Sequence, residues 1–379
     1  MVYLDHNAST PMDAVVLDVM LPFLQGHAGN ASSVHQAGRV ARAAIDHARE
    51  QVAALVNVQP AQVVFTAGGT EANNTALKSM RLTHGSSHLV VSSIEHESVL
   101  APARYLQQQG CRLDYAGVDT QGRVDKDALQ LMLSSGAQML SVVMANNETG
   151  VVQDIAALAE MAREHDVIMH TDAVQAAGKM ALDFSALGVQ MMSLSAHKMY
   201  GPKGIGALIL DPALELAPLL HGGSQERARR AGTENVAAIA GFGKAAELAA
   251  VGLLDRVVQL KALQIYLRQQ LETLPGVVMF SAEAECIPNT VQCSVLGIEG
   301  ETLLMQLDRE GFAVSSGAAC SSADSHPSHV LMAMGVAQDL ARGAIRISLG
   351  KMNTVTEIDQ FVVALNKVIG WSQRMVREA

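Results

Sequence analysis

The stretch Ser195-Ala196-His197-Lys198 closes a run of apolar residues and leads into Gly201-Pro202-Lys203-Gly204. The apolar run, Met191 to Ser195, predicts a short buried strand, which places Lys198 just beyond the end of that strand. A lysine held there can form an imine with an aldehyde cofactor, while the hydroxyl and imidazole beside it bind the cofactor's phosphate. The stretch therefore predicts a sheet with a lysine-linked cofactor at its edge.

Two other stretches supply groups that such a site needs. His170-Thr171-Asp172 ends another apolar run with a carboxylate, and Cys320 lies in the loop 314–324, which is rich in Ser, Gly and Ala. A buried carboxylate needs a cation or strong donors, and the protonated ring nitrogen of pyridoxal phosphate would supply the cation. The alternative for Asp172 is a structural acid bonded to a neighbouring helix end. Together the three groups predict a pyridoxal phosphate enzyme that hands an atom to a thiol.

The surroundings of Cys320 are unusual for a cysteine. Cysteine is most often a small buried hydrophobe, but the small neighbours of Cys320 predict an exposed and mobile stretch, which suits a nucleophile. A free thiol with a pKa of ~8.5 is mostly protonated at pH 7, so nearby cations must help it. Zinc binding with His326 and His329 is the disfavoured alternative, because no second cysteine stands near. The remaining cysteines lie in apolar contexts and are interpreted as structural: Cys111, Cys286 and Cys293.

Composition limits the class of protein. Of 379 residues 49% are apolar and only 3% aromatic, which favours helices packed on a mostly parallel sheet and leaves room for two domains. The net charge of −10 argues against a general nucleic-acid or membrane-surface binder, although Arg227, Arg229 and Arg230 form a local basic patch. The first residues do not form a secretory signal, and no apolar run approaches the ~20 residues that span a bilayer. We therefore expect a cytoplasmic protein.

Strands and helices alternate through the middle of the chain. Short buried strands joined by helices, such as the helix at 152–165, predict a mainly parallel sheet. Ligands of such sheets bind beyond the carboxyl ends of the strands, where Thr66, Asp172 and Ser195 would meet. The candidate strands are 63–66, 88–92, 139–144, 167–171, 191–195 and 205–210.

A smaller α+β domain is expected after a long helical pattern. That pattern runs from Thr233 to about Leu274, with an interruption near Gly252. It is followed by strands at 277–280 and 290–295, a helix at 301–310 and a strand at 344–349. We expect residues 12–255 to form a large cofactor-binding domain, and residues 1–11 and 256–379 to form a small domain that carries the loop of Cys320.

Five further segments offer polar groups that could bind a ligand. Residues 65–73 contain a glycine turn and a helix start with Thr70 as the expected cap, a typical phosphate cradle. His96 follows a strand and is either a capping residue or an imidazole stacked over a cofactor ring. Asn147 is either a turn residue or a donor to that ring. Arg346 lies inside an apolar strand and requires an anion, either a substrate carboxylate or an internal acid. Thr233 stands before the long helix and could complete a phosphate site.

These segments together resemble the cysteine desulfurases of the NifS/IscS type, which are class V aminotransferases of fold type I. The similarity extends from Tyr3-Leu4-Asp5-His6-Asn7-Ala8 to Ile345-Arg346-Ile347-Ser348-Leu349-Gly350. Six motifs occur in the expected order, and together they are highly specific. They are Thr70-Glu71, Glu95-His96, Asn146-Asn147-Glu148, Asp172-Ala173-Val174-Gln175, Ser195-Ala196-His197-Lys198 and Ser315-Ser316-Gly317-Ala318-Ala319-Cys320.

The resemblance implies a large domain with a mainly parallel sheet of seven strands flanked by helices, and a role for each matching residue. Pyridoxal phosphate would be joined to Lys198, with Asp172 on the ring nitrogen and His96 over the ring as acid and base. Gln175 and Asn147 would lie near the ring oxygen. The cradle of the cofactor and its phosphate would comprise Gly69, Thr70, Glu71, Ser195, His197 and, from a partner subunit, Thr233. The substrate would be bound by Arg346, Asn147 and Asn30.

The implied reaction is the removal of sulfur from L-cysteine by Cys320, which yields alanine and a persulfide on the enzyme. A homodimer and a sulfur-acceptor protein, such as an iron-sulfur scaffold, are implied as partners, without direct contacts to nucleic acid or membrane. No resident metal is implied, although Cys320 could ligate an iron-sulfur cluster transiently with a scaffold. Because the given sequence ends at Ala379, we expect it to lack the longer tail of housekeeping relatives, which leaves the acceptor open. Alternatives are a selenocysteine lyase or another β-elimination enzyme, and a sulfur-relay protein that acts mainly through partner binding.

Overall fold

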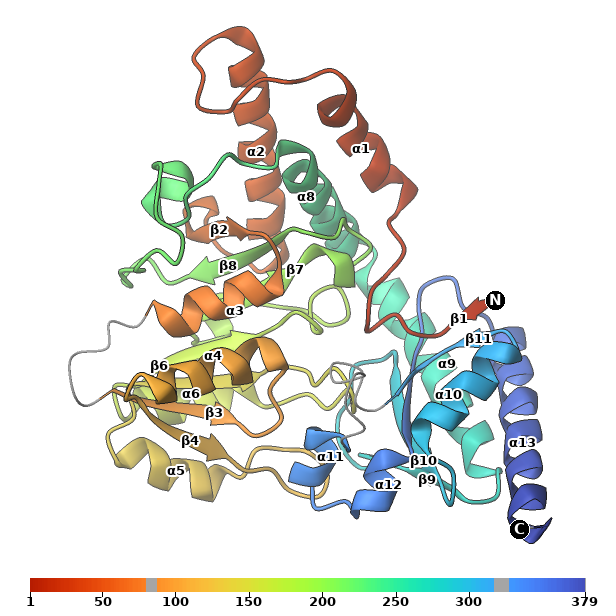
Figure 1. Ribbon diagram of the computed structural model, residues 1–379. Helices are drawn as coiled ribbons and strands as arrows, with labels where there is room; N and C mark the ends of the chain where they lie inside the picture. Colours follow the sequence, from red (N-terminus) through yellow and green to blue (C-terminus); the bar gives the residue numbers. More distant parts are fainter. Residues whose placement is uncertain (80–86, 317–326, 379) are drawn as a thin grey trace.

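The computed structural model describes residues 1–79, 87–316 and 327–378, the last seven of these as backbone only. Its largest sheet has seven strands in the order β2-β8-β7-β6-β5-β3-β4 (Figure 1). All neighbours in this sheet pair in parallel except β8, which runs antiparallel to β2 and β7. The strands are β2 (Val63–Thr66), β3 (His88–Ser92), β4 (Arg112–Ala116), β5 (Met139–Val143), β6 (Ile168–Asp172), β7 (Met191–Ser195) and β8 (Gly206–Leu210).

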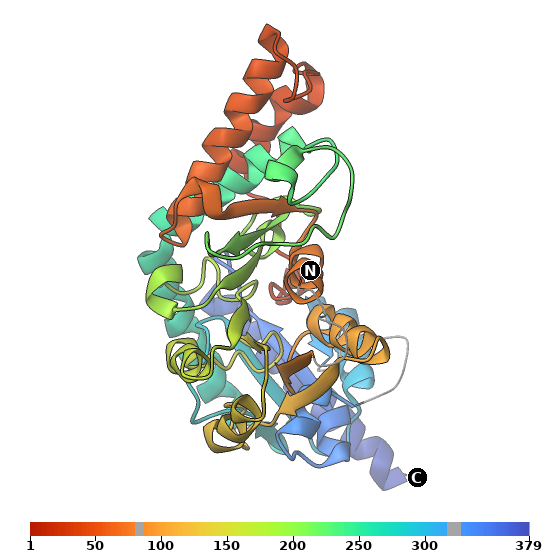
Figure 2. The same cartoon turned by 90° about the vertical axis from the view of Figure 1, so that its left-hand side faces the viewer.

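Helices cover both faces of this sheet (Figure 2). Alternate residues of each strand point to opposite faces, so in β8 Leu208 packs with one group of helices and Ile209 with the other. The first group is α3 (Gly69–Lys78) and α4 (Glu97–Gln108). The second is α1 (Ala14–Gln25), α2 (Gln36–Leu55), α5 (Lys126–Ser134), α6 (Ile155–Arg163), α7 (Phe184–Leu187) and α8 (Val236–Val251). The sheet is therefore buried on both faces, which explains its continuous apolar strands.

A second core lies at the other end of the molecule, around a four-stranded antiparallel sheet in the order β12-β13-β10-β9. The first residues of the chain join it, because β1 pairs in parallel with β11. Its strands are β1 (Val2–Tyr3), β9 (Val277–Met279), β10 (Thr290–Val295), β11 (Phe312–Ala313), β12 (Ser315–Ser316) and β13 (Ala344–Ser348). Its helices are α9 (Leu253–Glu272), α10 (Gly300–Arg309) and α13 (Val355–Glu378). Two short helices, α11 (His329–Ala333) and α12 (Gln338–Arg342), pack in a separate small cluster that also contains Ile94 and Val143 of the large domain.

The expected fold class is confirmed, and so are the six candidate strands, within one residue at each end. The long helical pattern is also interrupted as predicted, since α8 ends at Val251 and α9 starts after Gly252. The seventh strand, β4, was not assigned to a segment. It is an edge strand that carries Arg112 and Asp114, so its pattern is only partly apolar. The division at residues 12 and 255 stays a proposal, supported by the packing of α8 in the large core and α9 in the small one.

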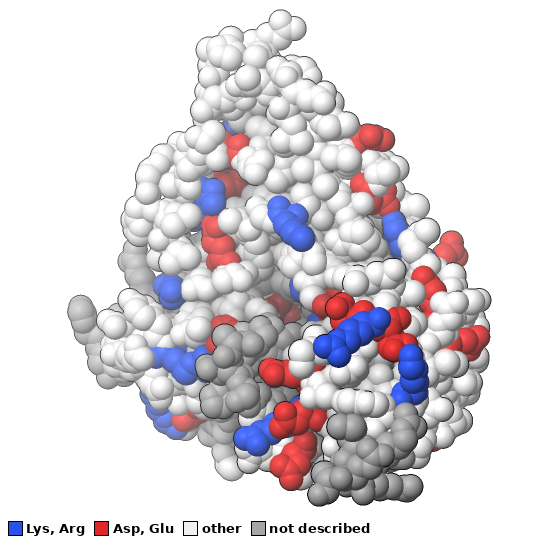
Figure 3. Space-filling model, turned by 45° about the vertical axis from the view of Figure 1, so that its right-hand side comes forward, with Lys and Arg blue, Asp and Glu red and all other residues white. Residues whose placement is uncertain are grey.

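The surface shown in Figure 3 carries acidic and basic side chains close to one another. In the predicted basic patch, Arg230 is paired with Glu71, while Arg227 and Arg229 donate to the carbonyl of Ala61. Within the described residues, no single helix is both long and apolar enough to cross a membrane. Helices α8 and α9, which meet at a bend of 71°, satisfy that test only as a pair.

Candidate active site

A cavity of about 380 Å³ lies beyond the carboxyl ends of the central strands, between the large sheet and the first residues of the chain. Its size falls in the range of small-molecule sites. It collects side chains from segments that are distant in sequence, as the parallel topology predicts. Ten of the predicted site residues line it: Gly69, Thr70, His96, Asn147, Asp172, Gln175, Ser195, His197, Lys198 and Arg346.

Lys198 ends a short 3-10 turn, Ala196–Lys198, directly after β7. Its Nζ atom donates to the backbone carbonyls of Asn7 and Ala8, at 2.8 Å for Ala8. The amine therefore lies at the junction between the large sheet and the N-terminal segment. Two carbonyl oxygens hold it in reach of a ligand in the cavity.

Asp172 is the last residue of β6, and its side chain is buried. Its Oδ1 accepts from the backbone N–H of Val174 at 3.0 Å, and its Oδ2 accepts from Nδ2 of Asn73 at 2.7 Å. Neither donor carries a full charge. A carboxylate in this place is thus oriented by neutral donors and directed at the cavity, where it can still bind a cation.

His96 has the capping role that the sequence offered, and its place at the cavity is compatible with the second role, which stays a prediction. It is the N-cap of α4, because its Nδ1 accepts from the backbone N–H of Ser98 at 3.0 Å, and its ring also lines the cavity. Burial lowers the pKa of His96, with a smaller effect in the opposite direction from Asp172. The imidazole is therefore held neutral at pH 7 on a fixed helix end.

The glycine turn before α3 differs from the prediction in one respect. Helix α3 begins at Gly69 with Gly68 as its N-cap, so Thr70 lies in the first turn and is not the cap. The turn packs tightly, and a Cβ on Gly69 would lie 2.8 Å from Cγ2 of Val174. A small residue is therefore favoured there, because the side chain of Val174 packs against this turn. The free N–H groups of the first turn consequently face the cavity edge, as anion sites do.

Ser195, His197 and Thr70 line a second cavity of about 770 Å³ that adjoins the first. His197 Nδ1 lies 3.3 Å from the hydroxyl of Ser9. Burial lowers the pKa of His197 to about 4, and the neighbouring Lys198 and Lys203 act in the same direction. This end of the site thus offers hydroxyl, imidazole and helix N–H groups, which is a suitable donor set for a phosphate.

Gln175 has a fixed orientation. Its Nε2 donates to the carbonyl of Asn7 at 2.9 Å, and its Oε1 accepts from Nζ of Lys179 at 2.7 Å. Lys179 is buried and also donates to Oδ1 of Asn7 at 2.9 Å. Since the carbonyl of Asn7 only accepts, the amide nitrogen of Gln175 must face it, and Oε1 faces Lys179.

Arg346 is buried in β13 and has an internal acidic partner. Its Nη2 donates to Oδ1 of Asp5 at 2.6 Å, and its Nη1 donates to the carbonyl of Asn147 at 3.0 Å. Its Nε has no partner among the described residues. The internal acid that the sequence offered as one alternative is therefore present, as Asp5, while the guanidinium also lines the cavity and the binding of a substrate carboxylate stays a prediction.

Four predicted residues are not placed in the Lys198 cavity. The carboxylate of Glu71 is held by Arg230 and by the backbone N–H of Ala67. Asn30 and Thr233 are exposed and do not line the cavity. Cys320 lies outside the described residues. The three cysteines that are described are buried free thiols, in agreement with their structural interpretation: Cys111, Cys286 and Cys293.

The residues present fit pyridoxal phosphate. The cavity has an amine on one wall, a buried carboxylate on another and phosphate donors at one end. Two buried polar atoms of lining residues, Oδ1 of Asn73 and Nε of Arg346, have no partner among the described residues, as expected where a polar ligand binds. No group of three or more His, Cys, Asp and Glu side chains in the described part of the chain is placed to hold a metal.

The sequence interpretation missed several lining residues. Asn7 connects Gln175, Lys179 and Lys198, although only its place in a family motif drew attention to it. Asn73 and Ser98 follow the predicted residues Gly69 and His96 by four and two positions. A helical spacing of four from Gly69 was the available signal for Asn73, since it places both on one face of α3.

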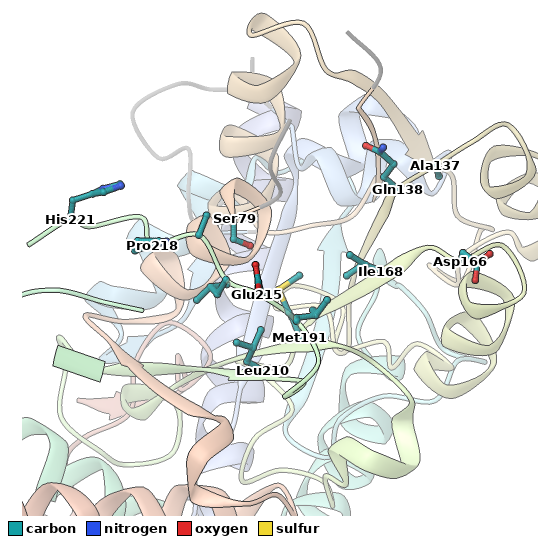
Figure 4. Close-up of a pocket in the computed structure, with 13 residues that line it drawn as sticks. Ser79, Ala137, Gln138, Asp166, Ile168, Met191, Leu210, Glu215, Pro218 and His221 are labelled. Carbon is teal, nitrogen blue, oxygen red and sulfur yellow. The ribbon is translucent and has the colours of Figure 1, made fainter. Parts of the chain in front are cut away.

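A third cavity, of about 660 Å³, lies at the opposite ends of the central strands from the Lys198 cavity (Figure 4). It is lined by Met191 at the start of β7 and Leu210 at the end of β8, together with Glu215 and His221 from the loop that follows. Of the described residues that line it, none belongs to the predicted site. Lys198 and Asp172 lie at the other ends of their strands, so the candidate chemistry belongs to the 380 Å³ cavity.

The chain belongs to the class-V aminotransferase family, whose model matches residues 2–361. It is 41% identical over 371 residues to "Cysteine desulfurase IscS" of Dictyoglomus turgidum, covering 97% of this chain and 94% of the relative. It is 42% identical over 378 residues to "Cysteine desulfurase" of Gluconacetobacter diazotrophicus, covering 99% and 94%. The resemblance drawn from the motifs is thus confirmed over nearly the whole chain.

Solved structures agree with this assignment. A NifS-like protein from Rickettsia africae superposes with a TM-score of 0.90 at 33% identity, covering 98% of this chain and 99% of that one. A structure described as SspA in complex with cysteine superposes with a TM-score of 0.82 at 32% identity, covering 92% and 99%. Fold and family are therefore the same as those of the NifS-like proteins.

Proposed function

We propose that this enzyme is a cysteine desulfurase that removes sulfur from L-cysteine with pyridoxal phosphate and leaves alanine and a persulfide. The observation that carries the proposal is the placement of Lys198, Asp172 and Arg346 around one cavity. Relatives of 38–42% identity, named cysteine desulfurases, support the activity over nearly the full length. The relative structure with bound cysteine supports the substrate.

Each residue of the site has a separate role in the proposed reaction. Bound pyridoxal phosphate would withdraw electrons from the carbon atoms of the substrate. Lys198 would hold the cofactor and move a proton at its Nζ, Asp172 would stabilise the charge of the ring nitrogen, and Arg346 would orient the substrate carboxylate. Thr70, Ser195 and His197 would hold the phosphate, while Gln175 and Asn147 would orient the ring.

Cys320 acts as the nucleophile in this proposal. Its thiolate attacks the sulfur of the substrate, so that a sulfur–sulfur bond forms and the carbon–sulfur bond breaks. The electron pair stays on carbon, which takes up a proton and becomes the methyl group of alanine. Atoms and charge balance without an added oxidant or reductant.

Mass spectrometry after incubation with cysteine tests the nucleophile. We expect ~32 Da, one sulfur atom, added to the peptide that contains Cys320, because the sulfur is transferred covalently. Cys320→Ala should keep the bound cofactor but form no alanine, whereas Cys111→Ala serves as a matched control that keeps the normal rate. Normal sulfide release by Cys320→Ala would show that the nucleophile is elsewhere. Rates with selenocysteine and cystine separate this activity from other β-eliminations.

Several finer points are part of the proposal. We propose a homodimer, because Thr233 and Asn30 are exposed and could complete the site of a partner subunit. Delivery of the sulfur to a protein of iron-sulfur assembly is supported by the relatives named IscS. The identity of the acceptor and a cytoplasmic location stay predictions.

A further inference from the structure

The backbone turn that carries Lys198 is bridged by a side chain from the first residues of the chain. The hydroxyl of Thr10 accepts a hydrogen bond from the backbone N–H of Tyr200 at 2.7 Å and donates to the carbonyl of His197 at 2.9 Å. Thr10 and Tyr200 are both buried, so the bridge is largely shielded from water. The hydroxyl thus connects the residue before Lys198 to the residue two positions after it.

Chemistry determines the direction of both bonds. A backbone N–H only donates and a backbone carbonyl only accepts, so the Thr10 oxygen must accept from Tyr200 and its hydrogen must go to His197. In an ordinary turn of four residues, the carbonyl of the first accepts directly from the N–H of the fourth. His197 and Tyr200 are the first and fourth residues here, and the hydroxyl is inserted between them. The side chain of Thr10 therefore holds open the turn whose second residue is Lys198.

The opened turn ends in an unfavourable backbone conformation. Tyr200 has a φ of +64°, in the left-handed region that bulky residues rarely adopt, and such a conformation persists only where the surrounding structure holds it. The backbone N–H of Asp13 donates to the carbonyl of Tyr200 at 3.0 Å, and that of Lys351 donates to its hydroxyl at 2.8 Å. The carbonyl and ring of Tyr200 are thus anchored by other groups, while its N–H depends, among the described residues, on Thr10.

Other contacts do not replace this bridge. The backbone N–H of Thr10 also donates to the carbonyl of His197 at 2.9 Å, and this bond stays whatever the side chain, but it does not reach Tyr200. The contacts of Lys198 Nζ with two carbonyls lie at the end of a flexible four-carbon side chain, so they leave its backbone free to move. The position of the Lys198 backbone therefore depends on the hydroxyl of Thr10.

We propose that Thr10 is a positioning residue that holds the turn of Lys198 open and thereby directs the amine at the aldehyde carbon of pyridoxal phosphate. The inference rests on the proposed function for the identity of the cofactor. A buried N–H without a partner is costly, so without the hydroxyl the N–H of Tyr200 bonds directly to the carbonyl of His197, and Lys198 moves as the turn closes. A displacement of about 1 Å can slow a reaction about 100-fold.

The rate at which the cofactor attaches to Lys198 tests the inference. Full-length protein freed of cofactor is mixed with pyridoxal phosphate, and absorbance near ~420 nm follows bond formation. Borohydride reduction and peptide mass spectrometry then identify the modified lysine. Thr10→Val keeps the shape of the side chain but lacks the hydroxyl, so we expect attachment about 10- to 100-fold slower than in the wild type.

Turnover gives a second measurement. With cysteine as substrate, Thr10→Val should lower kcat about 10- to 100-fold with little change in KM. The reason is that Lys198 would move the proton, whereas Arg346, which would bind the substrate carboxylate, is untouched.

Controls separate positioning from stability. Thr10→Ser keeps the hydroxyl and should restore attachment and kcat to within about threefold of the wild type. Thr273→Val removes an exposed hydroxyl that also donates to a carbonyl, at the end of α9, and should leave both unchanged. Urea unfolding measures the stability of each variant. Should Thr10→Val fail to fold, Thr10→Ala, which removes the hydroxyl without adding an apolar group, carries the test.

Two results overturn the inference. One is attachment at the wild-type rate in Thr10→Val, even if this variant is less stable, because the hydroxyl would then have a structural role alone. The other is a Thr10→Ser variant as slow as Thr10→Val. A wild-type protein that does not attach the cofactor, or attaches it and forms no alanine, would instead contradict the proposed function, so the two failures are distinguishable.

Discussion

Arg346 is held in the site by two contacts that leave part of its guanidinium available. Asp5 and the carbonyl of Asn147 occupy the two terminal nitrogens, while Nε has no partner among the described residues. A guanidinium has five donors in a planar fork, so it can bind a substrate carboxylate beside Asp5. The pair with Asp5 also lowers the cost of burying the charge before the substrate binds.

Arg346→Lys tests this role. Lysine keeps the charge but loses the planar fork, so KM for cysteine should rise about 10- to 100-fold, which corresponds to about 1.4–2.8 kcal/mol. The absorbance of the bound cofactor should stay, because Lys198 and Asp172 are untouched. Steady-state kinetics measure the effect, with the exposed Arg123→Lys as control. An unchanged KM would contradict the role in substrate binding.

At the scale of elements, the centre of the large sheet contains a buried histidine. His170 of β6 has one ring nitrogen 2.9 Å from the hydroxyl of Ser141 in β5 and the other 2.9 Å from that of Ser193 in β7. Burial lowers the pKa of His170 to about 3. The neutral ring thus bridges three adjacent strands, and its protonation would place an uncompensated charge in the core.

His170 makes stability depend on pH. Its pKa is about 3 when folded, against the ordinary 6.5, so the unfolded chain binds the proton more readily between these values. The contribution of His170 is therefore complete above pH 6.5 and is lost as the pH falls toward 3, by up to about 1.4 kcal/mol per pH unit. Urea unfolding between pH 7.5 and 5 should show a shallower pH dependence for His170→Gln than for the wild type.

A matched control isolates this effect. His47 is exposed on α2, so His47→Gln should keep the wild-type pH dependence. Burial also lowers the pKa values of His6 and His197 to about 4, but these residues are present in both proteins and their effects cancel in the comparison. Equal pH dependence of His170→Gln and the wild type would show that His170 is not the titrating group.

At the scale of the whole molecule, the proposed dimer would complete the phosphate site of each subunit with a residue of its partner. The phosphate end of the Lys198 cavity opens into the adjoining 770 Å³ cavity, where Thr70 is exposed. Thr233 of the same chain is exposed and does not line either cavity. A second copy that inserts its own Thr233 would complete the phosphate site, as a symmetric dimer allows.

Complementation between two inactive variants tests this arrangement. Lys198→Ala lacks the essential amine, and Thr233→Asp places a negative charge against the phosphate, so each homodimer should be inactive or nearly so. A heterodimer purified through two different tags has one intact site if Thr233 acts across the interface. It should then show about half of the wild-type rate of alanine formation. A heterodimer as inactive as its parents would place Thr233 in the site of its own chain.

The apolar strands, the break near Gly252 and the placement of Lys198, Asp172 and His96 at strand ends could be read from the amino-acid order. The reason is that burial of one face makes apolar residues recur at a regular spacing in each helix or strand. In addition, the carboxyl ends of parallel strands lie on the same side of the sheet. The pairs Asn73–Asp172 and Asp5–Arg346, 99 and 341 residues apart, required the folded chain. Such contacts depend on how whole elements are placed relative to one another, and no local period encodes that placement.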